Sequence, residues 1–254
     1  MPFLELGGYS GATITFVAAS AVIAGLARGF SGFGAALIFI PLASTVIDPR
    51  IAAALLLIID IVMASPLLPR AWVIADRRDV GTMLLGTLVG VPTGTFVLTR
   101  TDPVAIRWMI AALVVAMLAL LMSGWRYHGR PAAPVGAGVG LVAGFFTGIA
   151  QVGGPPIVAY WLGTAKRSDL VRANIVVYFA ASAFITLVSY AVADLLTLRV
   201  IGLALLIGPA YGLGLWAGSH TFGFASEATF RRTCYVLIAA AGIVSMPVLD
   251  GVIR

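Results

Sequence analysis

The sequence has few charged residues: they make up 10% of its 254 positions, whereas hydrophobic residues make up 61%. A soluble globular domain carries roughly a quarter charged residues. So few charges cannot cover a water-exposed surface of this size, and their scarcity excludes a cytosolic enzyme. The mean hydropathy of +1.06 indicates a chain that is embedded in a membrane over nearly its whole length.

Cysteine and histidine are also scarce. The one cysteine, Cys234, excludes an internal disulfide and a cysteine-based metal cage. The two histidines, His128 and His220, lie too far apart in the sequence to indicate a metal site. The phosphate-binding pattern G-x-x-x-x-G-K-[ST] is absent, so ATP hydrolysis is not expected. We therefore expect no metal and no cofactor.

The net charge of +6 does not point to nucleic acid, because the basic residues fall in short gaps between apolar runs and form no stripe. The patterns H-E-x-x-H and G-x-S-x-G are absent, and Asp60, the only acid at the centre of an apolar run, has no obvious second carboxylate. An intramembrane enzyme would need such groups, so we expect that the chain is not an enzyme.

Six apolar stretches have about the 20 residues that a membrane-spanning helix needs; they are 51–68, 80–99, 104–123, 171–193, 198–219 and 230–249. Two further stretches, 11–47 and 135–164, are too long for one span, and each is broken centrally by glycine. The first break covers residues 28–34 and the second covers 148–156. A broken helix at membrane depth survives only inside protein or beside a water-filled cavity.

The distribution of basic residues indicates that each broken stretch is a hairpin that returns to its starting side. Hairpins place ten Lys/Arg residues in cytoplasmic gaps and five outside, the latter being Arg50, Arg100, Arg107, Arg199 and Arg254. Single spans would instead put the cluster from Lys166 to Arg172 outside, against the positive-inside rule. In the hairpin topology both termini are predicted outside.

The predicted fold is therefore an all-α integral membrane protein with an inverted-topology repeat. Each half is a glycine-broken helical hairpin plus three transmembrane helices, over 1–124 and 135–254, with the loop 125–134 between them in a single membrane domain. Glycines support this duplication: Ala24, Gly25, Gly29 and Gly34 recur 119 residues later, and Gly90 and Gly94 match Gly208 and Gly212 at 118. In secondary transporters of this architecture, the binding site lies near the midplane where broken helices meet.

At the two breaks the sequence resembles the sulfite exporter TauE/SafE family. The matching residues are Gly29 to Gly34 with Pro41 and Leu42, then Gly148, Gly153 to Pro156 and Tyr160, and downstream Arg172 to Asn174 with Tyr178 and Phe179. Ala35 and Gln151 stand where the family often has glycine. The resemblance covers essentially the whole chain and implies transport of small sulfur oxyanions or organosulfonates across the bacterial inner membrane.

Glycine-rich breaks can present successive backbone N–H groups to an anion, and a helix that restarts there points its positive end at the ligand. The candidate substrate-binding residues at or near the breaks are Arg28, Ser31, Gly32, Gly34, Gln151, Gly153, Gly154, Pro155 and Asn174. The alternative is that the glycines only allow close helix crossing and that the polar side chains join helices. Close packing is our interpretation of the glycines in the later spans, Gly90 among them.

Two intramembrane charges are ambiguous. Arg28 lies near the turn of the first hairpin and could offer a planar fork to a sulfonate, or it could reach the membrane interface. Asp60 lies mid-span and could carry a coupling proton, or it could be a structural partner of Arg28. The aromatic pair Tyr160 and Trp161 is typical of interfacial anchors.

The sequence therefore predicts a multi-pass secondary transporter of a small anion, sulfite or an organosulfonate, in the inner membrane. Its expected partners are that substrate and membrane lipid, and the oligomeric state is not encoded visibly. Export is favoured because an inside-negative potential drives anions outward. The open alternatives are a carrier of another small solute (carboxylate, amino acid or metal ion) and a membrane scaffold subunit that transports nothing.

Overall fold

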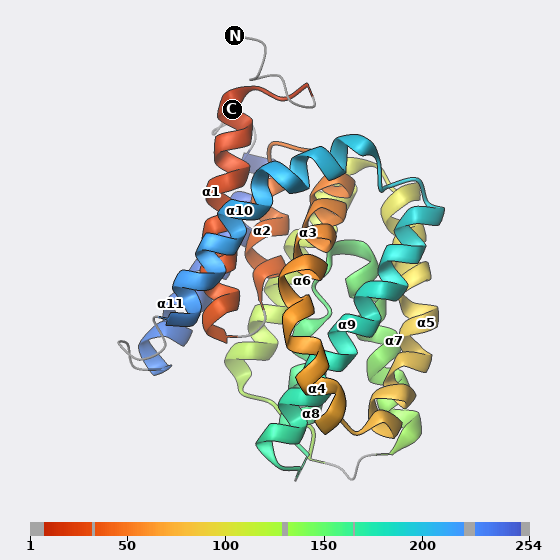
Figure 1. Ribbon diagram of the computed structural model, residues 1–254. Coiled ribbons are helices and arrows are strands. Elements are labelled where there is room, and N and C mark those ends of the chain that lie inside the picture. Colours follow the sequence, from red (N-terminus) through yellow and green to blue (C-terminus); the bar gives the residue numbers. More distant parts are fainter. Residues whose placement is uncertain (1–7, 32–33, 129–131, 165, 221–226, 250–254) are drawn as a thin grey trace. The chain divides into compact units, whose positions relative to one another are not determined.

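The computed structural model describes residues 8–31, 34–128, 132–164, 166–220 and 227–249, and in these residues it contains helices but no strand (Figure 1). The helices are α1 (Gly11–Ser31), α2 (Ala35–Ala43), α3 (Pro49–Ala64), η2 (Ser65–Leu67), α4 (Leu68–Ile74), α5 (Arg77–Arg100), α6 (Pro103–Ser123), α7 (Ala133–Ala150), α8 (Gly154–Leu162), α9 (Ser168–Val192), α10 (Leu198–His220), α11 (Glu227–Val244) and η4 (Pro247–Leu249).

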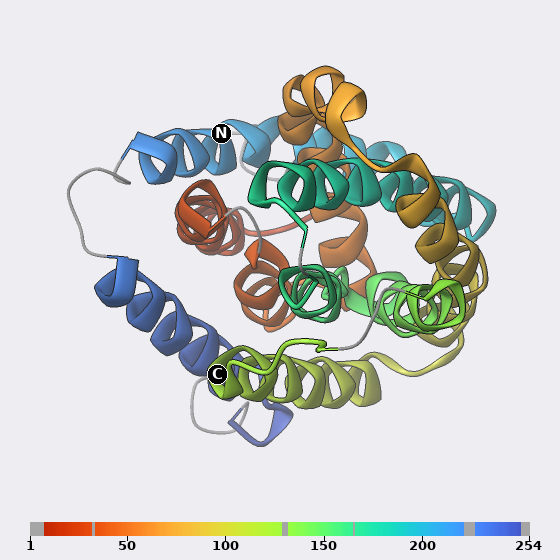
Figure 2. The same ribbon diagram turned by 90° about the horizontal axis from the view of Figure 1, so that it is seen from below.

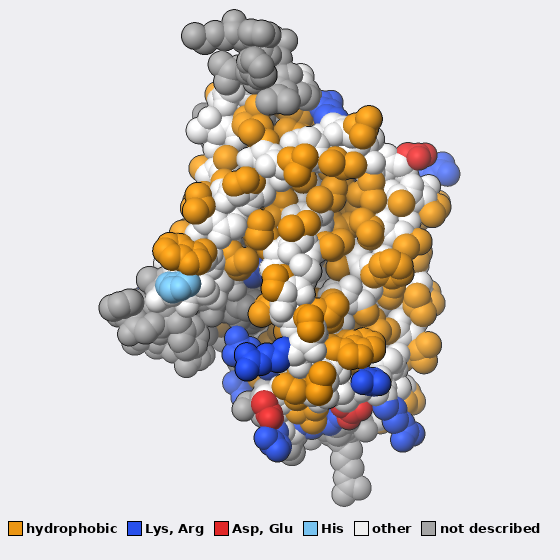
Figure 3. All heavy atoms as spheres, in the orientation of Figure 1, with side chains coloured by type: hydrophobic (Ala, Val, Ile, Leu, Met, Phe, Trp, Pro, Cys, Tyr) orange, Lys and Arg blue, Asp and Glu red, His pale blue; other side chains and the backbone are white. Residues whose placement is uncertain are grey.

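In the described residues, seven stretches of helix are long and apolar enough to cross a membrane, so the all-helical, multi-pass prediction is confirmed. Five of the six expected spans are among them, and the sixth, 230–249, contains α11, whose apolar stretch Arg232–Val244 is shorter than a spanning helix. The first expected span differs in detail, because the α-helix ends at Ala64, continues as the 3-10 turn η2 and resumes as α4 at Leu68. Pro66 and Pro69 stand at the starts of η2 and α4, and proline interrupts the helical hydrogen-bond ladder. On the face shown in Figure 3, hydrophobic side chains cover the helices and charged side chains gather toward their ends.

The chain forms two compact units that do not coincide with its two halves. The first unit consists of 1–59, 101–118 and 195–254, and the second of 60–100 and 119–194. Each unit thus combines a broken hairpin from one half with a long helix from the other. The duplication over 1–124 and 135–254 stays a prediction, because these units follow a different division of the chain.

In the first unit, α2 returns along α1, and α10 packs against the same helix (Figures 1 and 2). The contact between α1 and α10 is a backbone contact. A Cβ on Gly25 or Gly29 would overlap the carbonyl oxygens of Tyr211 or Leu215. Glycine at these positions lets the two helices approach within van der Waals distance, as small residues do in membranes.

In the second unit, α5 and α7 pack side by side in the same way (Figures 1 and 2). A Cβ on Gly90 or Gly94 would overlap the carbonyl oxygens of Leu141 or Phe145, so the close-packing interpretation is correct for these glycines. It does not hold for Gly208, where the nearest atom to an added Cβ is 3.9 Å away. Helix α9 covers this pair and α8, and the buried aromatic side chains of Tyr160, Trp161 and Tyr178 gather there.

The two units repeat one another in local detail. The returning helices α2 and α8 have nine residues each, and their bounds differ by 119. Gly214 contacts Val22, and Gly218 contacts Leu26. The residues 119 positions after Val22 and Leu26 are Leu141 and Phe145, which Gly90 and Gly94 contact. The partners of Gly90 and Gly94 are therefore Gly214 and Gly218, and the match to Gly208 and Gly212 was wrong. These agreements favour duplication, while its inverted orientation stays a prediction.

Candidate functional site

The second helix break lies between α7, which ends at Ala150, and α8, which begins at Gly154. Gly153 must be glycine, because a Cβ there would overlap the Ala143 carbonyl oxygen and the Thr147 hydroxyl. Gly154 differs, because an added Cβ would meet only Phe179 Cζ, at 3.6 Å. Pro155 stands in the first turn of α8, where its missing N–H removes no hydrogen bond.

Three consecutive backbone N–H groups at this break are available to a ligand. Those of Val152, Gly153 and Gly154 donate to no acceptor among the residues that the structure describes. Val152 and Gly153 are buried, and a buried N–H without an acceptor costs free energy. The same groups form the N-terminal end of α8, where the helix dipole favours negative charge. The break is therefore suited to an anion.

Gln151 and Tyr190 close one side of the break. Gln151 Nε2 donates to the Tyr190 hydroxyl at 3.4 Å, and that hydroxyl donates to the carbonyl oxygen of Gly148 at 3.0 Å. Tyr190 comes from α9 and is fully buried. The sequence did not reveal this role of Tyr190, because the residue lies 39 positions from Gln151 in an apolar run without a motif.

Replacing Gln151 with glycine is expected to stabilise the protein. Gln151 has a φ of 58°, which costs a residue with a Cβ about 1 kcal/mol. Glycine would adopt this φ without that cost. The long hydrogen bond to Tyr190 offsets little of that cost. We expect Gln151→Gly to raise the thermal unfolding temperature of purified protein and Gln151→Ala to lower it. Equal temperatures for both variants would show that the backbone conformation is unstrained.

Asn174 lies at the other end of α8 from the break. Its Oδ1 accepts a hydrogen bond from the backbone N–H of Asp76 at 2.8 Å, just before α5. The side chain is fully buried, and Nδ2 has no hydrogen-bond partner among the described residues. The structure thus does not bring Asn174 together with Gln151 and the glycines, and its substrate contact stays a prediction.

Tyr160 and Trp161 are core residues, so their prediction as interfacial anchors was wrong. They are 2% and 0% exposed. Trp161 packs edge-on against Tyr178, with ring centroids 5.8 Å apart, and its indole N–H donates to Asp79 at 2.9 Å. The two residues lie near the end of an apolar run, where aromatic residues at the membrane interface also occur. In the structure, however, α9 covers both rings.

The single lysine joins the two loops beside this aromatic core. Lys166 Nζ lies 2.9 Å from Asp76 Oδ2 and 3.0 Å from Asp79 Oδ2. The hydrogen bond from Lys166 lowers the pKa of Asp76 below its usual 3.8. Burial opposes the charge on Lys166, but the two carboxylates outweigh burial and raise its pKa above 10.5. The cluster fastens the start of α5 to the α8–α9 loop.

Lys166→Met is expected to destabilise the protein by about 1 kcal/mol at neutral pH, since the ion pair is partly exposed. The contribution of Asp76 is present above its unfolded pKa and is lost as the pH falls through its lowered folded pKa. That of Lys166 is lost as the pH rises through its raised folded pKa. Thermal unfolding of both proteins against pH should show a difference that shrinks at both extremes. A constant difference would contradict the ion-pair explanation.

The first break is described in part. Arg28 is half-buried in the last turn of α1, and Gly34 precedes α2 with a φ of 92° and open space around its Cα. Ser31 ends α1, with its side chain outside the described atoms, and Gly32 lies outside the described residues. Asp60 is half-buried in α3. Because Arg28 belongs to the first unit and Asp60 to the second, their pairing stays a prediction.

These features define a class of membrane protein. The chain is a multi-pass helical membrane protein with broken hairpins, and in the described residues no group of His, Cys, Asp and Glu could hold a metal ion. The sulfite exporter TauE/SafE family matches residues 17–245, and the chain belongs to this family of membrane transporters. No curated protein and no solved structure matches the chain.

Proposed function

We propose that the protein exports a small sulfur-containing anion, sulfite or an organosulfonate, across the inner membrane by alternating access around its two helix breaks. The observation that carries this proposal is the run of available N–H groups from Val152 to Gly154. An anion at membrane depth needs donors that replace its water, because an uncompensated buried charge is costly. Family membership supports the substrate class.

The predicted residues at the two breaks have distinct roles in this mechanism. The N–H groups at the start of α8 hold the oxyanion, and Gln151 lies beside them. Gly154 leaves the space that the ligand enters. Arg28 supplies a guanidinium that binds two oxygens of a sulfonate or sulfite. Ser31, Gly32 and Gly34 provide the equivalent surface at the first break.

The membrane potential supplies the driving force in the proposed direction. An anion that leaves a cytoplasm with a negative potential gains about 2.3 kcal/mol per charge per 100 mV. Export therefore needs no coupled ion. In this proposal both termini lie outside and Asp60 serves structure rather than proton coupling.

The test is anion efflux from liposomes that contain purified protein under an imposed potential. We expect sulfite or a small organosulfonate to leave faster than from empty liposomes, and faster than sulfate or acetate. Arg28→Gln should reduce this flux at least tenfold while the protein stays folded. Arg167→Gln is the matched control, because Arg167 is an exposed loop residue with a side chain 85% accessible, and it should leave the flux unchanged.

Other results separate the alternatives. Preference for acetate would favour a carboxylate carrier and overturn the sulfur assignment. Absence of flux for all four anions, with folded protein in the liposomes, would favour another solute or a scaffold subunit. Equal flux in wild type and Arg28→Gln would remove Arg28 from the binding site while leaving transport itself in place.

A further inference from the structure

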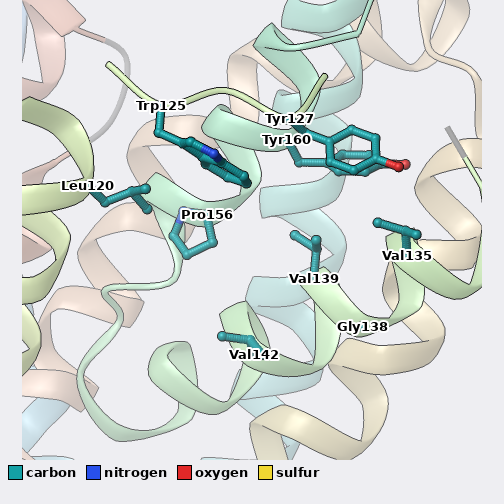
Figure 4. Close-up of a pocket in the computed structure, with 9 residues that line it drawn as sticks. All are labelled: Leu120, Trp125, Tyr127, Val135, Gly138, Val139, Val142, Pro156 and Tyr160. Carbon is teal, nitrogen blue, oxygen red and sulfur yellow. The ribbon is translucent and has the colours of Figure 1, made fainter. Parts of the chain in front are cut away.

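An apolar pocket of about 400 Å³ opens on the second unit (Figure 4). Val139 and Val142 of α7 form one wall, and Pro156 and Tyr160 of α8 form another. Trp125 and Tyr127, in the linker between α6 and α7, cover it. Ligand pockets have volumes of roughly 300–1,000 Å³, so the space is large enough for a chain of methylene groups. Its lining offers almost no partner for a small hydrophilic anion.

The linker over the pocket is held firmly on α8. The backbone N–H of Tyr127 donates to the carbonyl oxygen of Ala159 at 3.1 Å. A Cβ on Gly163 would overlap the Tyr127 backbone, so this glycine permits the approach. The rings of Tyr127 and Tyr160 stack with centroids 5.2 Å apart and planes at 29° (Figure 4). The pocket is therefore a formed feature of the unit.

The sequence of the linker identifies the occupant. Trp125 and Tyr127 follow the end of α6 at Ser123, where aromatic residues mark the membrane interface. Arg126, between these two pocket residues, is exposed and forms no ion pair with any residue that the structure describes. Apolar space next to an interfacial cation matches a lipid whose acyl chain is buried and whose phosphate is at the surface.

We propose that this pocket binds one acyl chain of an anionic phospholipid, with the lipid phosphate at Arg126. The bound chain contacts Pro156 in the first turn of α8, the turn that begins at Gly154. The lipid thus stabilises the returning arm of the second hairpin. This site is separate from the anion site, and its occupancy does not depend on which solute the protein carries.

The test uses the purified full-length protein in detergent, titrated with phosphatidylglycerol that carries bromine on its acyl chains. Bromine quenches tryptophan fluorescence on contact, and Trp125 is in the pocket wall. The difference between wild type and Trp125→Phe isolates the signal from Trp125. We expect this signal to fall saturably. Brominated phosphatidylcholine, which has no net charge, serves as the comparison lipid.

Two matched glycine variants locate the binding site. Gly138 lines the pocket and an added Cβ there meets nothing within 4 Å, so Gly138→Leu fills the pocket without touching the backbone. We expect it to weaken quenching at least tenfold. Gly202, on α10, is exposed and equally open, and Gly202→Leu should titrate as wild type does. Arg126→Gln should weaken binding of brominated phosphatidylglycerol several-fold and weaken that of phosphatidylcholine less, because choline balances the charge of its phosphate.

Each of the following outcomes would overturn the proposal. Quenching that rises in proportion to lipid without saturating, or that is the same in Gly138→Leu, would mean that lipid only surrounds the protein. No weakening of either lipid by Arg126→Gln would exclude the phosphate contact, and equal weakening of both would exclude the preference for an anionic lipid. If Gly138→Leu is misfolded, Val142→Phe provides the same test, because Val142 is 48% exposed at the pocket.

Discussion

Gly140→Leu is expected to prevent the protein from folding. Gly140 lies on α7 against α5, and a Cβ there would overlap the carbonyl oxygen of Met83. Overpacking a core costs about 1–3 kcal/mol when side chains can shift. Here the obstacle is helix backbone, so α5 and α7 would have to separate along their length. The packing free energy lost between these two helices would be a large part of the roughly 5–15 kcal/mol that keeps a domain folded.

Gly138→Leu is the matched control for this prediction, because it lies two residues away on the same helix and its Cβ meets open space. Size-exclusion chromatography and thermal unfolding in detergent measure the outcome. We expect a monodisperse peak for Gly138→Leu and aggregated protein for Gly140→Leu. A folded Gly140→Leu protein with an unchanged unfolding temperature would show that α5 and α7 are not in backbone contact.

Gly154→Val is expected to abolish anion flux while the protein stays folded. The added side chain would project from the start of α8, where only Phe179 lies nearby. It would therefore occupy the space in front of the N–H groups of Val152 to Gly154 without distorting the helix. We expect efflux of sulfite or sulfonate from liposomes to fall at least tenfold.

The controls for this prediction are two other glycines. Gly81, the fifth residue of α5, is open to a Cβ, and Gly81→Val should transport as wild type does. Gly153→Ala should fail to fold, because Ala143 and Thr147 already fill its space. Normal flux in folded Gly154→Val would place the anion elsewhere.

The spans and breaks could be predicted from the sequence because long apolar runs and glycine-rich interruptions are local signals. The glycine match of the two halves was only partly predictable. In a glycine-rich apolar background, Gly90 aligns as well with Gly208 as with Gly214. Only the contacts with α1 and α7 distinguish them, because these depend on how helices distant in sequence lie against each other.

The candidate site shows the same limit. The sequence predicted the second break, including Gln151, Gly153 and Gly154, because glycine and proline change backbone geometry where they stand. It did not predict Tyr190, whose hydroxyl reaches the break from α9. Nor did it show that Asn174 lies beside Asp76. Hydrogen bonds between helices carry no local pattern, so such partners emerge only from the fold.

The interleaving of the two units has a consequence for synthesis of the protein. In the second unit, α5 contacts α7, and the contact between Gly86 and Ala137 joins residues about 50 positions apart. In the first unit, Gly25 contacts Tyr211, which is 186 positions later. A ribosome adds roughly 5–20 residues per second, so about 10–40 seconds pass between the synthesis of α1 and that of α10. During that interval the glycine face of α1 is exposed to lipid or to the cell's insertion machinery, and nascent chains should be most vulnerable to degradation then.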